Sequence, residues 1–403
     1  MPATSQHPHL HQRAALRAYL GLMIVTACCF GMEYAPQPMY NTISRALGVS
    51  RTSIGWLVGV FMLSLTLSPL FVGLLLSRAG IRRAVLVSSV ILGASGAGIW
   101  LADSFGALMA VRALQALLVP VVLTAVMTAI SSLFRHFDLS RALAGYVAVN
   151  LVGSLSGRIG GGISADILGW KQTLVLFCLP FFAALPFVWH LPEIKMPESA
   201  AHRPKMRDYL AIARTPGVGS LLLIDSCSLF AFTAVGNMLP LRMAELGYGN
   251  SDTLAGIMYT GYSIGIAASL LINPIKRLCA GNARTLIFGA LVYMLSAVSM
   301  AAPSLWVIFA GIWGMAFGQF VVHAMSPGLI NMFAAQGGGG CSRAMANGLF
   351  LSCTYLGGLL GSWLPAAIYS RCGWTTCYVC LQATVALLFA AVLKLVLTRP
   401  ELR

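Results

Sequence analysis

The chain contains 403 residues, of which 58% are hydrophobic and only 9% are charged. Soluble globular proteins are about one quarter charged. This composition, with a mean hydropathy of +0.82, excludes a disordered chain, a disulfide-rich miniprotein and an ordinary soluble enzyme. The net charge of +15 does not indicate nucleic-acid binding, because the basic residues fall in short breaks between apolar runs. The composition therefore predicts an integral membrane protein with no nucleic-acid partner.

Charges, prolines and polar clusters divide the chain into apolar segments long enough to cross a bilayer as helices. The expected spans lie at 17–38, 52–75, 84–101, 106–130, 142–165, 171–191, 216–240, 252–274, 283–302, 304–331, 343–367 and 374–397. Between Thr285 and Ser342 there is no Asp, Glu, Lys or Arg, and Pro303 divides this long stretch into two spans. The sequence therefore predicts an all-α membrane protein with 12 transmembrane helices.

The distribution of Lys and Arg predicts the orientation, because these residues concentrate in cytoplasmic segments. With the N-terminus inside, 19 basic residues fall in inner segments and five in outer loops. We therefore expect both termini to be cytoplasmic in a protein of the bacterial inner membrane. Its basic inner surface is suited to contact with anionic membrane lipids.

The two halves of the chain resemble each other at nearly constant spacing. The matched positions are Gly55 with Gly256, Gly80 with Gly281, Arg83 with Arg284, Gly145 with Gly348, and Gly169-Trp170 with Gly373-Trp374. Two six-helix halves of the same orientation are typical of transporters that rock about a central cavity. The expected parts are an N-terminal tail at 1–16, the halves at 17–191 and 216–397, a cytoplasmic linker at 192–215, and a C-terminal tail at 398–403.

The sequence contains possible motifs for metal binding and enzyme chemistry, but their surroundings do not support these functions. The CxxC at Cys377 and Cys380 has no second ligand pair, so we expect no metal site. The G-x-S-x-G run at 261–265 lies in the middle of a span, and the glycines at 337–340 are not followed by a phosphate-binding Lys. We expect neither enzymatic activity nor a cofactor, so an ion gradient or the substrate itself must supply the energy.

Four charged residues fall inside predicted spans, where each costs about 2.5–3.5 kcal/mol to insert. They are Glu33, Arg112, Arg158 and Asp225. Glu33 is either a proton-carrying carboxylate or half of a static ion pair between spans 1 and 4. Arg112 is expected to tune a carboxylate. Asp225 is either a second proton-binding or cation-binding group or a structural partner of a neighbouring span.

Arg158 and His323 also allow two interpretations each. Arg158 either reaches outward to Asp166, eight residues further along the chain, or contacts an anionic substrate. His323, one helical turn from Gln319, either relays protons or is a packing residue held by hydrogen bonds.

Polar and aromatic residues of the spans supply candidates for a substrate pocket. The candidates are Gln37, Tyr40, Tyr146, Asn150, Arg158, Tyr262, Gln319 and His323. Each of these side chains can instead hydrogen-bond a neighbouring helix. For Asn150 and Tyr262, the sequence favours neither alternative.

Three motifs resemble those of the major facilitator superfamily. The segment from Gly73 to Arg83, with Ser77, Arg78, Gly80 and Arg82, is similar to its G-x-L-x-D-R-x-G-R-R conformational loop. Arg112-Ala-Leu-Gln115 resembles its R-x-x-Q-G motif. The glycines Gly153, Gly157, Gly160 and Gly161 resemble the G-x-x-x-G-P-x-x-G-G signature of its proton-coupled antiporters.

The resemblance covers the whole chain, and residues 35–38 and 48–50 are similar to the twelve-span drug and metabolite exporters. Two positions depart from the family pattern. The usual loop Asp is Ser77, which weakens a charge-stabilised latch, and the usual antiporter Pro is Arg158. The resemblance implies a monomer that moves a small molecule and uses protons.

These observations predict a proton-coupled antiporter that exports a drug, a metabolite or a siderophore-like chelator. One alternative is a symporter that imports an organic anion bound by Arg158 and Arg112. Another is a receptor or sensor that binds a ligand without transporting it, although the sequence has no appended soluble domain to support this.

Overall fold

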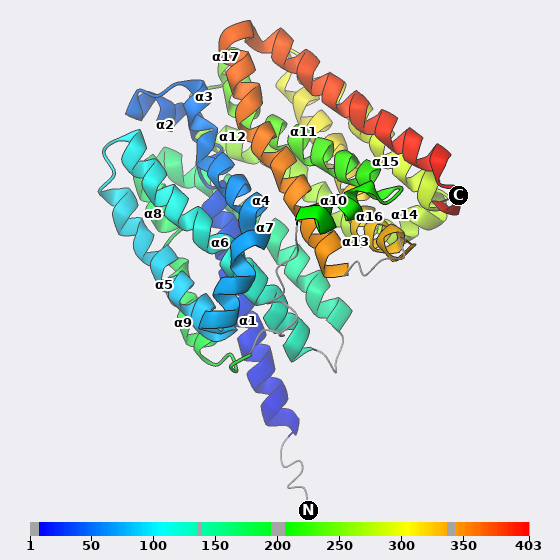
Figure 1. Cartoon of the computed structure of the whole chain (residues 1–403). Coiled ribbons are helices and arrows are strands. Elements are labelled where there is room, and N and C mark those ends of the chain that lie inside the picture. The colour runs from blue at the N-terminus through cyan, green and yellow to red at the C-terminus, as the bar shows by residue number, and fades with distance from the viewer. Residues whose placement is uncertain (1–7, 135–138, 195–205, 337–342, 403) are drawn as a thin grey trace, which may run out of the picture.

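The computed structural model describes residues 8–134, 139–194, 206–336 and 343–402, and every regular element in these ranges is helical (Figure 1). The first half contains α1 (Pro8–Tyr34), α2 (Tyr40–Leu47), α3 (Arg51–Ile54), α4 (Trp56–Ala79), α5 (Ile81–Trp100), α6 (Phe105–Leu133), α7 (Leu139–Leu168), α8 (Trp170–Leu176) and α9 (Pro180–Trp189). The second contains α10 (Met206–Arg214), α11 (Val218–Glu245), α12 (Asp252–Met258), η2 (Tyr259–Ser263), α13 (Ile264–Leu270), α14 (Ile272–Leu278), α15 (Asn282–Ala297), η3 (Val298–Ala301), α16 (Leu305–Gln336), α17 (Arg343–Thr398) and η4 (Pro400–Leu402).

In the described chain, ten helical segments are long and apolar enough to cross a membrane, judged by length and composition. α17 counts once among them, although it contains the last two predicted spans. These meet at Gly373, whose φ of 77° interrupts the helix. α7 is not among the ten. The eighth predicted span is divided, because the 3-10 turn η2 separates α12 from α13.

The two halves of the chain lie side by side in the bundle (Figure 1), and each contains one large hydrophobic core. Buried residues between Ala18 and Leu191 form the first, and buried residues between Ile212 and Leu402 form the second. Ile212 belongs to α10, so a described part of the predicted linker is helical and packs on the second core. The helix α1 begins at Pro8, within the predicted N-terminal tail.

Matched glycines of the two halves have the same structural role. Gly80 and Gly281 each begin a helix after a short turn, with φ of 77° and 128°. Gly169 and Gly373 join the last two spans of their halves, with φ of 89° and 77°. Residues with a Cβ rarely adopt these backbone angles, so glycine is required at both turns.

The halves approach most closely at two crossings that also involve a matched pair of glycines. Gly55 packs against the carbonyl oxygen of Ser362 in α17. A Cβ on Gly256 would lie 2.7 Å from the carbonyl oxygen of Arg158 in α7. Both crossings lie toward the end of the bundle that carries α2 and Gly373, which we call the upper end as drawn in Figure 1.

Candidate functional site

Glu33 lies in the last turn of α1, and its side chain is completely buried. Among the described residues, neither carboxylate oxygen has a hydrogen-bond partner, and no cationic nitrogen lies within 4.0 Å. Arg112 and Arg158 act on this carboxylate electrostatically from further away, and the neighbouring Tyr34 hydroxyl is available to donate a hydrogen bond to it. Buried polar groups are normally satisfied, so this carboxylate calls for a proton, a water molecule or a ligand.

Arg112 joins α6 to α1 and α4 through backbone carbonyls. Its Nη2 donates to the carbonyl of Glu33 at 2.8 Å, and Nη1 donates to that of Met32 at 3.0 Å. Nε and Nη2 both donate to the carbonyl of Leu57, at 3.2 and 2.9 Å, and Nη1 also reaches Gln115. The structure thus contains a link between spans 1 and 4, but Arg112 does not form a direct ion pair with the Glu33 carboxylate.

Arg158 is buried in α7 and makes its hydrogen bonds along the helix and across to Gln37, in the turn between α1 and α2. Nε donates to Oε1 of Gln37 at 2.7 Å, and Nη1 donates to the carbonyl and hydroxyl oxygens of Ser154. The expected contact with Asp166 is wrong, because that carboxylate is occupied by residues of the other half. No carboxylate of the described chain lies within 4.0 Å of the Arg158 guanidinium.

Three tyrosines surround the Arg158 guanidinium. Its central carbon lies 3.9 Å from the ring centre of Tyr34 in α1, and 5.5 and 5.2 Å from those of Tyr259 and Tyr262 in η2. The 3-10 turn places both of the latter tyrosines toward α7. Cation–π contacts with both halves therefore hold a guanidinium that has no acidic partner.

A hydrogen-bond network continues from Gln37 into the second half. Gln37 donates to the amide oxygen of Asn237 at 2.6 Å, and the Tyr40 hydroxyl donates to the same oxygen at 3.2 Å. Asn237 in turn donates to the carbonyl of Ser362 at 3.2 Å. Two predicted pocket residues, Gln37 and Tyr40, are thus engaged in holding the halves together.

Asp166, at the end of α7, closes the upper end. Its carboxylate accepts backbone hydrogen bonds from Asp252 at 3.1 Å and Thr253 at 2.9 Å, and a hydroxyl bond from Ser251 at 3.3 Å. Partial burial alone would raise the pKa of Asp166, but the hydrogen bonds from Thr253, Asp252 and Ser251 outweigh it and lower the pKa below 3.8. A carboxylate of one half therefore caps a helix of the other.

Further hydrogen bonds join the halves at the same end. They connect Asn41 with Pro240, Thr42 with Asp252, and Thr52 with Ser370. In the described chain, the side-chain hydrogen bonds between the two halves lie in this upper region. The structure is therefore closed at the upper end.

Asp225 and His323 form a pair that the sequence did not predict. The Asp225 carboxylate in α11 is completely buried, and Nδ1 of His323 in α16 lies 3.0 Å from its Oδ2. The Thr354 hydroxyl of α17 donates to the same oxygen at 2.9 Å. Asp225 thus has structural partners on two neighbouring helices, as one of its two interpretations expected. Its proton-binding role stays a prediction.

The remaining pocket candidates occupy different settings. Gln319 accepts a hydrogen bond from Ser228, whose carbonyl is bound by the Tyr293 hydroxyl at 2.9 Å. Tyr146 and Asn150 lie one turn apart on α7, and the buried Asn150 carbonyl oxygen has no partner in the described chain.

The conformational-loop residues lie at the lower end of the first half. A Cβ on Gly80 would meet the carboxylate of Glu193, and the Arg82 guanidinium lies 5.1 Å from the ring centre of Trp189. The side chains of Arg78 and Arg83 are exposed. In this closed-top structure the loop therefore packs on the end of its own half. Gly73 and Ser77 precede it in the last turns of α4.

The glycines of the antiporter-like motif allow α7 to pack directly on α1. A Cβ on Gly153 would lie 2.6 Å from the carbonyl oxygen of Ala27, and one on Gly161 would lie 2.7 Å from that of Ala35. Gly157, midway between them, contacts α1 in the same way, whereas Gly160 faces α8. The motif thus brings Arg158 and Glu33 onto adjacent helices.

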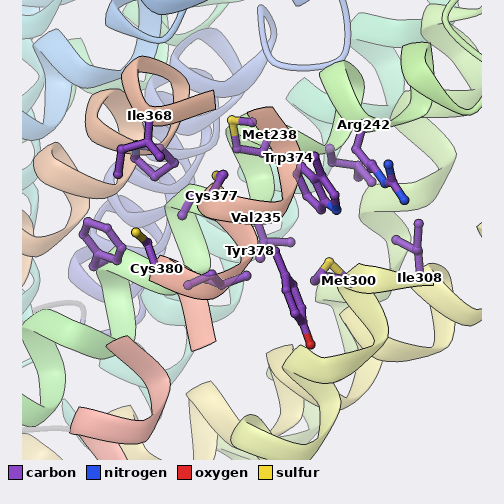
Figure 2. Close-up of a pocket in the computed structure, with 15 residues that line it drawn as sticks. Val235, Met238, Arg242, Met300, Ile308, Ile368, Trp374, Cys377, Tyr378 and Cys380 are labelled. Atoms are coloured by element: carbon purple, nitrogen blue, oxygen red, sulfur yellow. The ribbon is translucent and has the colours of Figure 1, made fainter. Parts of the chain in front are cut away.

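A separate apolar pocket lies in the second half, between α11, α16 and the last part of α17 (Figure 2). It contains no residue of the charged site. Its lining includes Met238, Arg242, Met300, Ile308, Trp374, Cys377, Tyr378 and Cys380. Arg242 packs over the Trp374 ring at 4.9 Å and pairs with Glu245 at 3.1 Å. Both thiols of the CxxC thus line an apolar wall.

Sequence reasoning missed Tyr34 and Thr354, and it did not sort Tyr259 or Asn237 from other polar residues. Proximity of Tyr34 to Glu33 was a usable signal. The contacts made by Thr354 and Asn237 depend on the packing of distant spans, which no local pattern reveals.

The helical fold, with charged groups buried between two pseudo-symmetric cores, defines a multi-pass membrane transporter. The Major Facilitator Superfamily family model matches residues 22–249, so this chain belongs to that superfamily.

Relatives and solved structures agree with this assignment. The inner membrane transport protein YnfM of Escherichia coli is 24% identical, over 93% of this chain and 89% of its own length. The drug efflux pump JefA of Mycobacterium tuberculosis is 25% identical over 48% of this chain and 36% of its own. The nucleoside transporter NupG shares the fold with a TM-score of 0.72 at 14% identity, over 95% of this chain and 98% of its own.

A bacterial homologue of the lysosomal transporter Spinster, solved in an inward-facing and unoccupied conformation, also has this fold. Its TM-score is 0.69 at 14% identity, over 98% of this chain and 96% of its own.

Proposed function

We propose that this protein is a proton-coupled antiporter that exports a small organic solute across the bacterial inner membrane by alternating access. Glu33 is the group that carries the proton. The observation that supports this role is its complete burial without a hydrogen-bond partner, between two arginines that bind other groups. Glu33 can therefore change its charge when a proton or a substrate binds. A carboxylate held in a fixed ion pair could not do so.

We further propose twelve membrane crossings, with both termini and the linker in the cytoplasm and one chain as the working unit. α17 supplies two crossings on either side of Gly373, and α7 supplies one more than the ten apolar segments. The upper end is then the outer surface. The closed upper end then corresponds to a state that takes up substrate and releases protons inside.

The charge of the substrate determines the sign of coupling in this site. A neutral solute that hydrogen-bonds to ionised Glu33 competes with the proton, which gives antiport. An organic anion bound by Arg158 is repelled by ionised Glu33, so it binds together with a proton, which gives symport. A proton that crosses the full potential contributes about 2.3 kcal/mol per 100 mV in either case.

The import of an organic anion is the second candidate, because Arg158 has no carboxylate partner among the described residues. Arg112 does not fit the role of anion reader that this alternative gave it, since its guanidinium already donates to three backbone carbonyls. Arg158→Lys should then weaken binding of anions while sparing neutral solutes, because a lysine cannot reproduce the planar guanidinium contacts.

The decisive experiment measures proton movement in inverted membrane vesicles that carry the wild type or Glu33→Gln. The vesicles are acidified inside, and ethidium, uridine and benzoate are added in turn. A solute that discharges the gradient with the wild type but not with Glu33→Gln supports antiport through Glu33. Protons that move in the same direction as the solute support the importer. Exchange that persists with Glu33→Gln contradicts both, and binding without flux favours a receptor.

A further inference from the structure

The second half contains a titratable cluster that the Glu33 mechanism does not use. Asp225, His323 and Thr354 come from three different helices, α11, α16 and α17, and meet at mid-span. The Asp225 carboxylate is completely buried, while 38% of the His323 side-chain surface is accessible. In this pair the acid is therefore buried, and the imidazole is the partly accessible group.

Hydrogen bonding fixes the orientation of the imidazole. An ionised carboxylate only accepts hydrogen bonds, so Nδ1 of His323 carries the hydrogen that Asp225 accepts. Phe350 stacks on the ring with centroids 6.2 Å apart, and Phe320 lies edge-on at 6.5 Å. Nε2 has no hydrogen-bond partner among the described residues, which leaves its lone pair available to accept a proton.

Other titratable groups near the pair are tyrosines. Tyr355 of α17 interacts electrostatically with both Asp225 and Glu33. The Tyr293 hydroxyl of α15 is committed to the carbonyl of Ser228. No Lys or Arg of the described chain lies within 4.0 Å of Asp225, so His323 is its only close candidate for a positive charge there.

We propose that His323, held by Asp225 and Thr354, is a second proton-binding site of this transporter, separate from Glu33. A proton delivered by water binds the Nε2 lone pair, and no covalent bond is broken. The pair then changes from a net charge of −1 to zero, which is the favourable direction inside a membrane. One site in each half gives two protons per transport cycle. This count rests on the proposed proton coupling, whereas the titration of His323 does not.

The first test follows the histidine nitrogens of the full-length protein in detergent micelles by ¹⁵N NMR. The signal absent from His323→Gln identifies His323. We expect the Nδ1–H tautomer at high pH and a second proton at acid pH. Asp225→Asn should move the midpoint to lower pH by one unit or more, because the negative partner is lost. Thr354→Val should leave the His323 ring less well oriented, but His323 should still titrate.

Two results would overturn the second site. One is an Nε2–H tautomer that persists throughout, and the other is a His323 signal that does not change between pH 4 and pH 9. His190→Gln is the matched control, because His190 is exposed and remote from Asp225. Its replacement should leave the His323 titration unchanged.

The second test uses the vesicle assay with the same three solutes. With His323→Gln, whose amide can still bond Asp225, the protons moved per solute should fall from two to one. An unchanged ratio contradicts the proposal. Loss of a titrating His323 signal while Glu33→Gln still abolishes exchange would remove the second site and leave the proposed function intact. If His323 titrates but Glu33→Gln exchanges normally, the second site stands and the proposed role of Glu33 is wrong.

Discussion

Gln37 and Asn237 form a 2.6 Å hydrogen bond across the molecule although they lie 200 positions apart in the chain. Their separation is within one residue of the repeat shift that relates Gly55 to Gly256. The bond therefore joins nearly equivalent positions of the two halves, close to the axis that relates them. The bond lies at the upper end, where the two halves must separate for that end to open, so it is suited to hold the upper end closed.

Asn237→Leu should open the upper end. The change removes the acceptor of Gln37 and Tyr40 and the donor to Ser362, each worth about 1 kcal/mol, so the open population should rise roughly tenfold or more. Spin labels at 46 and 250, in a cysteine-free background, report the change as a longer distance. Asn331→Leu, which breaks bonds to Pro327 and Asn347 away from this end, should leave the distance unchanged.

Asp166→Asn should weaken the same closure through charge. Because hydrogen bonds lower the Asp166 pKa in the closed state, its contribution is present above 3.8 and is lost as pH falls through the lowered value. The wild-type label distance should therefore stay constant from pH 8 to pH 5. Asp166→Asn should raise the open population about fivefold across this range, a modest effect because the site is exposed.

The control for this prediction is Asp103→Asn. Asp103 is an exposed acid that pairs with Lys171 of its own half at 2.8 Å. An equal change in the label distance for both variants would show that negative surface charge in general, and not the cap on α12, controls the closure.

Gly153→Ala should destabilise the first half. The added methyl would lie 2.6 Å from the carbonyl oxygen of Ala27, which forces α1 and α7 apart at a cost of about 1–3 kcal/mol. Thermal unfolding in detergent measures the loss. Gly348→Ala is the matched control, because no atom lies within 4 Å of the added methyl. It should be neutral or slightly stabilising, since alanine favours helices.

Arg112→Lys should lower stability although it keeps the positive charge. A lysine cannot satisfy the carbonyls of Met32, Glu33 and Leu57 together, and unsatisfied buried carbonyls cost about 1–3 kcal/mol each. A melting temperature equal to that of the wild type would indicate that charge alone matters at this position. Arg45→Lys, at an exposed position, is the comparison.

Local patterns were sufficient to predict much of the fold. Hydrophobic runs are set by the bilayer thickness, so the helices follow the predicted spans within a few residues. The matched glycines Gly169 and Gly373 predicted equivalent turns, because a turn with a positive φ favours glycine and can therefore be recognised in the sequence. The 3-10 turn at Tyr259–Ser263 has no such signal, since its residues also suit an α-helix.

The site was less predictable, because side-chain partners depend on three-dimensional packing. The four buried charges were identified by their cost alone. Arg112 binds backbone carbonyl groups. Because every residue has one, the sequence could not predict which of them Arg112 would bind. One of the two interpretations of Arg158 had it reach Asp166 along its own helix, yet that carboxylate binds the start of α12 instead. Asp225 and His323 are 98 positions apart, and only the packing of α11 on α16 brings them together.

The turn at Gly373 has a practical consequence for engineering the upper end of the molecule. The last two spans follow each other within one continuous helical element, interrupted by a single positive φ. A tag or a fluorescent protein inserted there would have to break this hairpin and displace Trp374 from Arg242. Residues 45–50, where α2 ends at exposed positions, offer a better place for an epitope at this end.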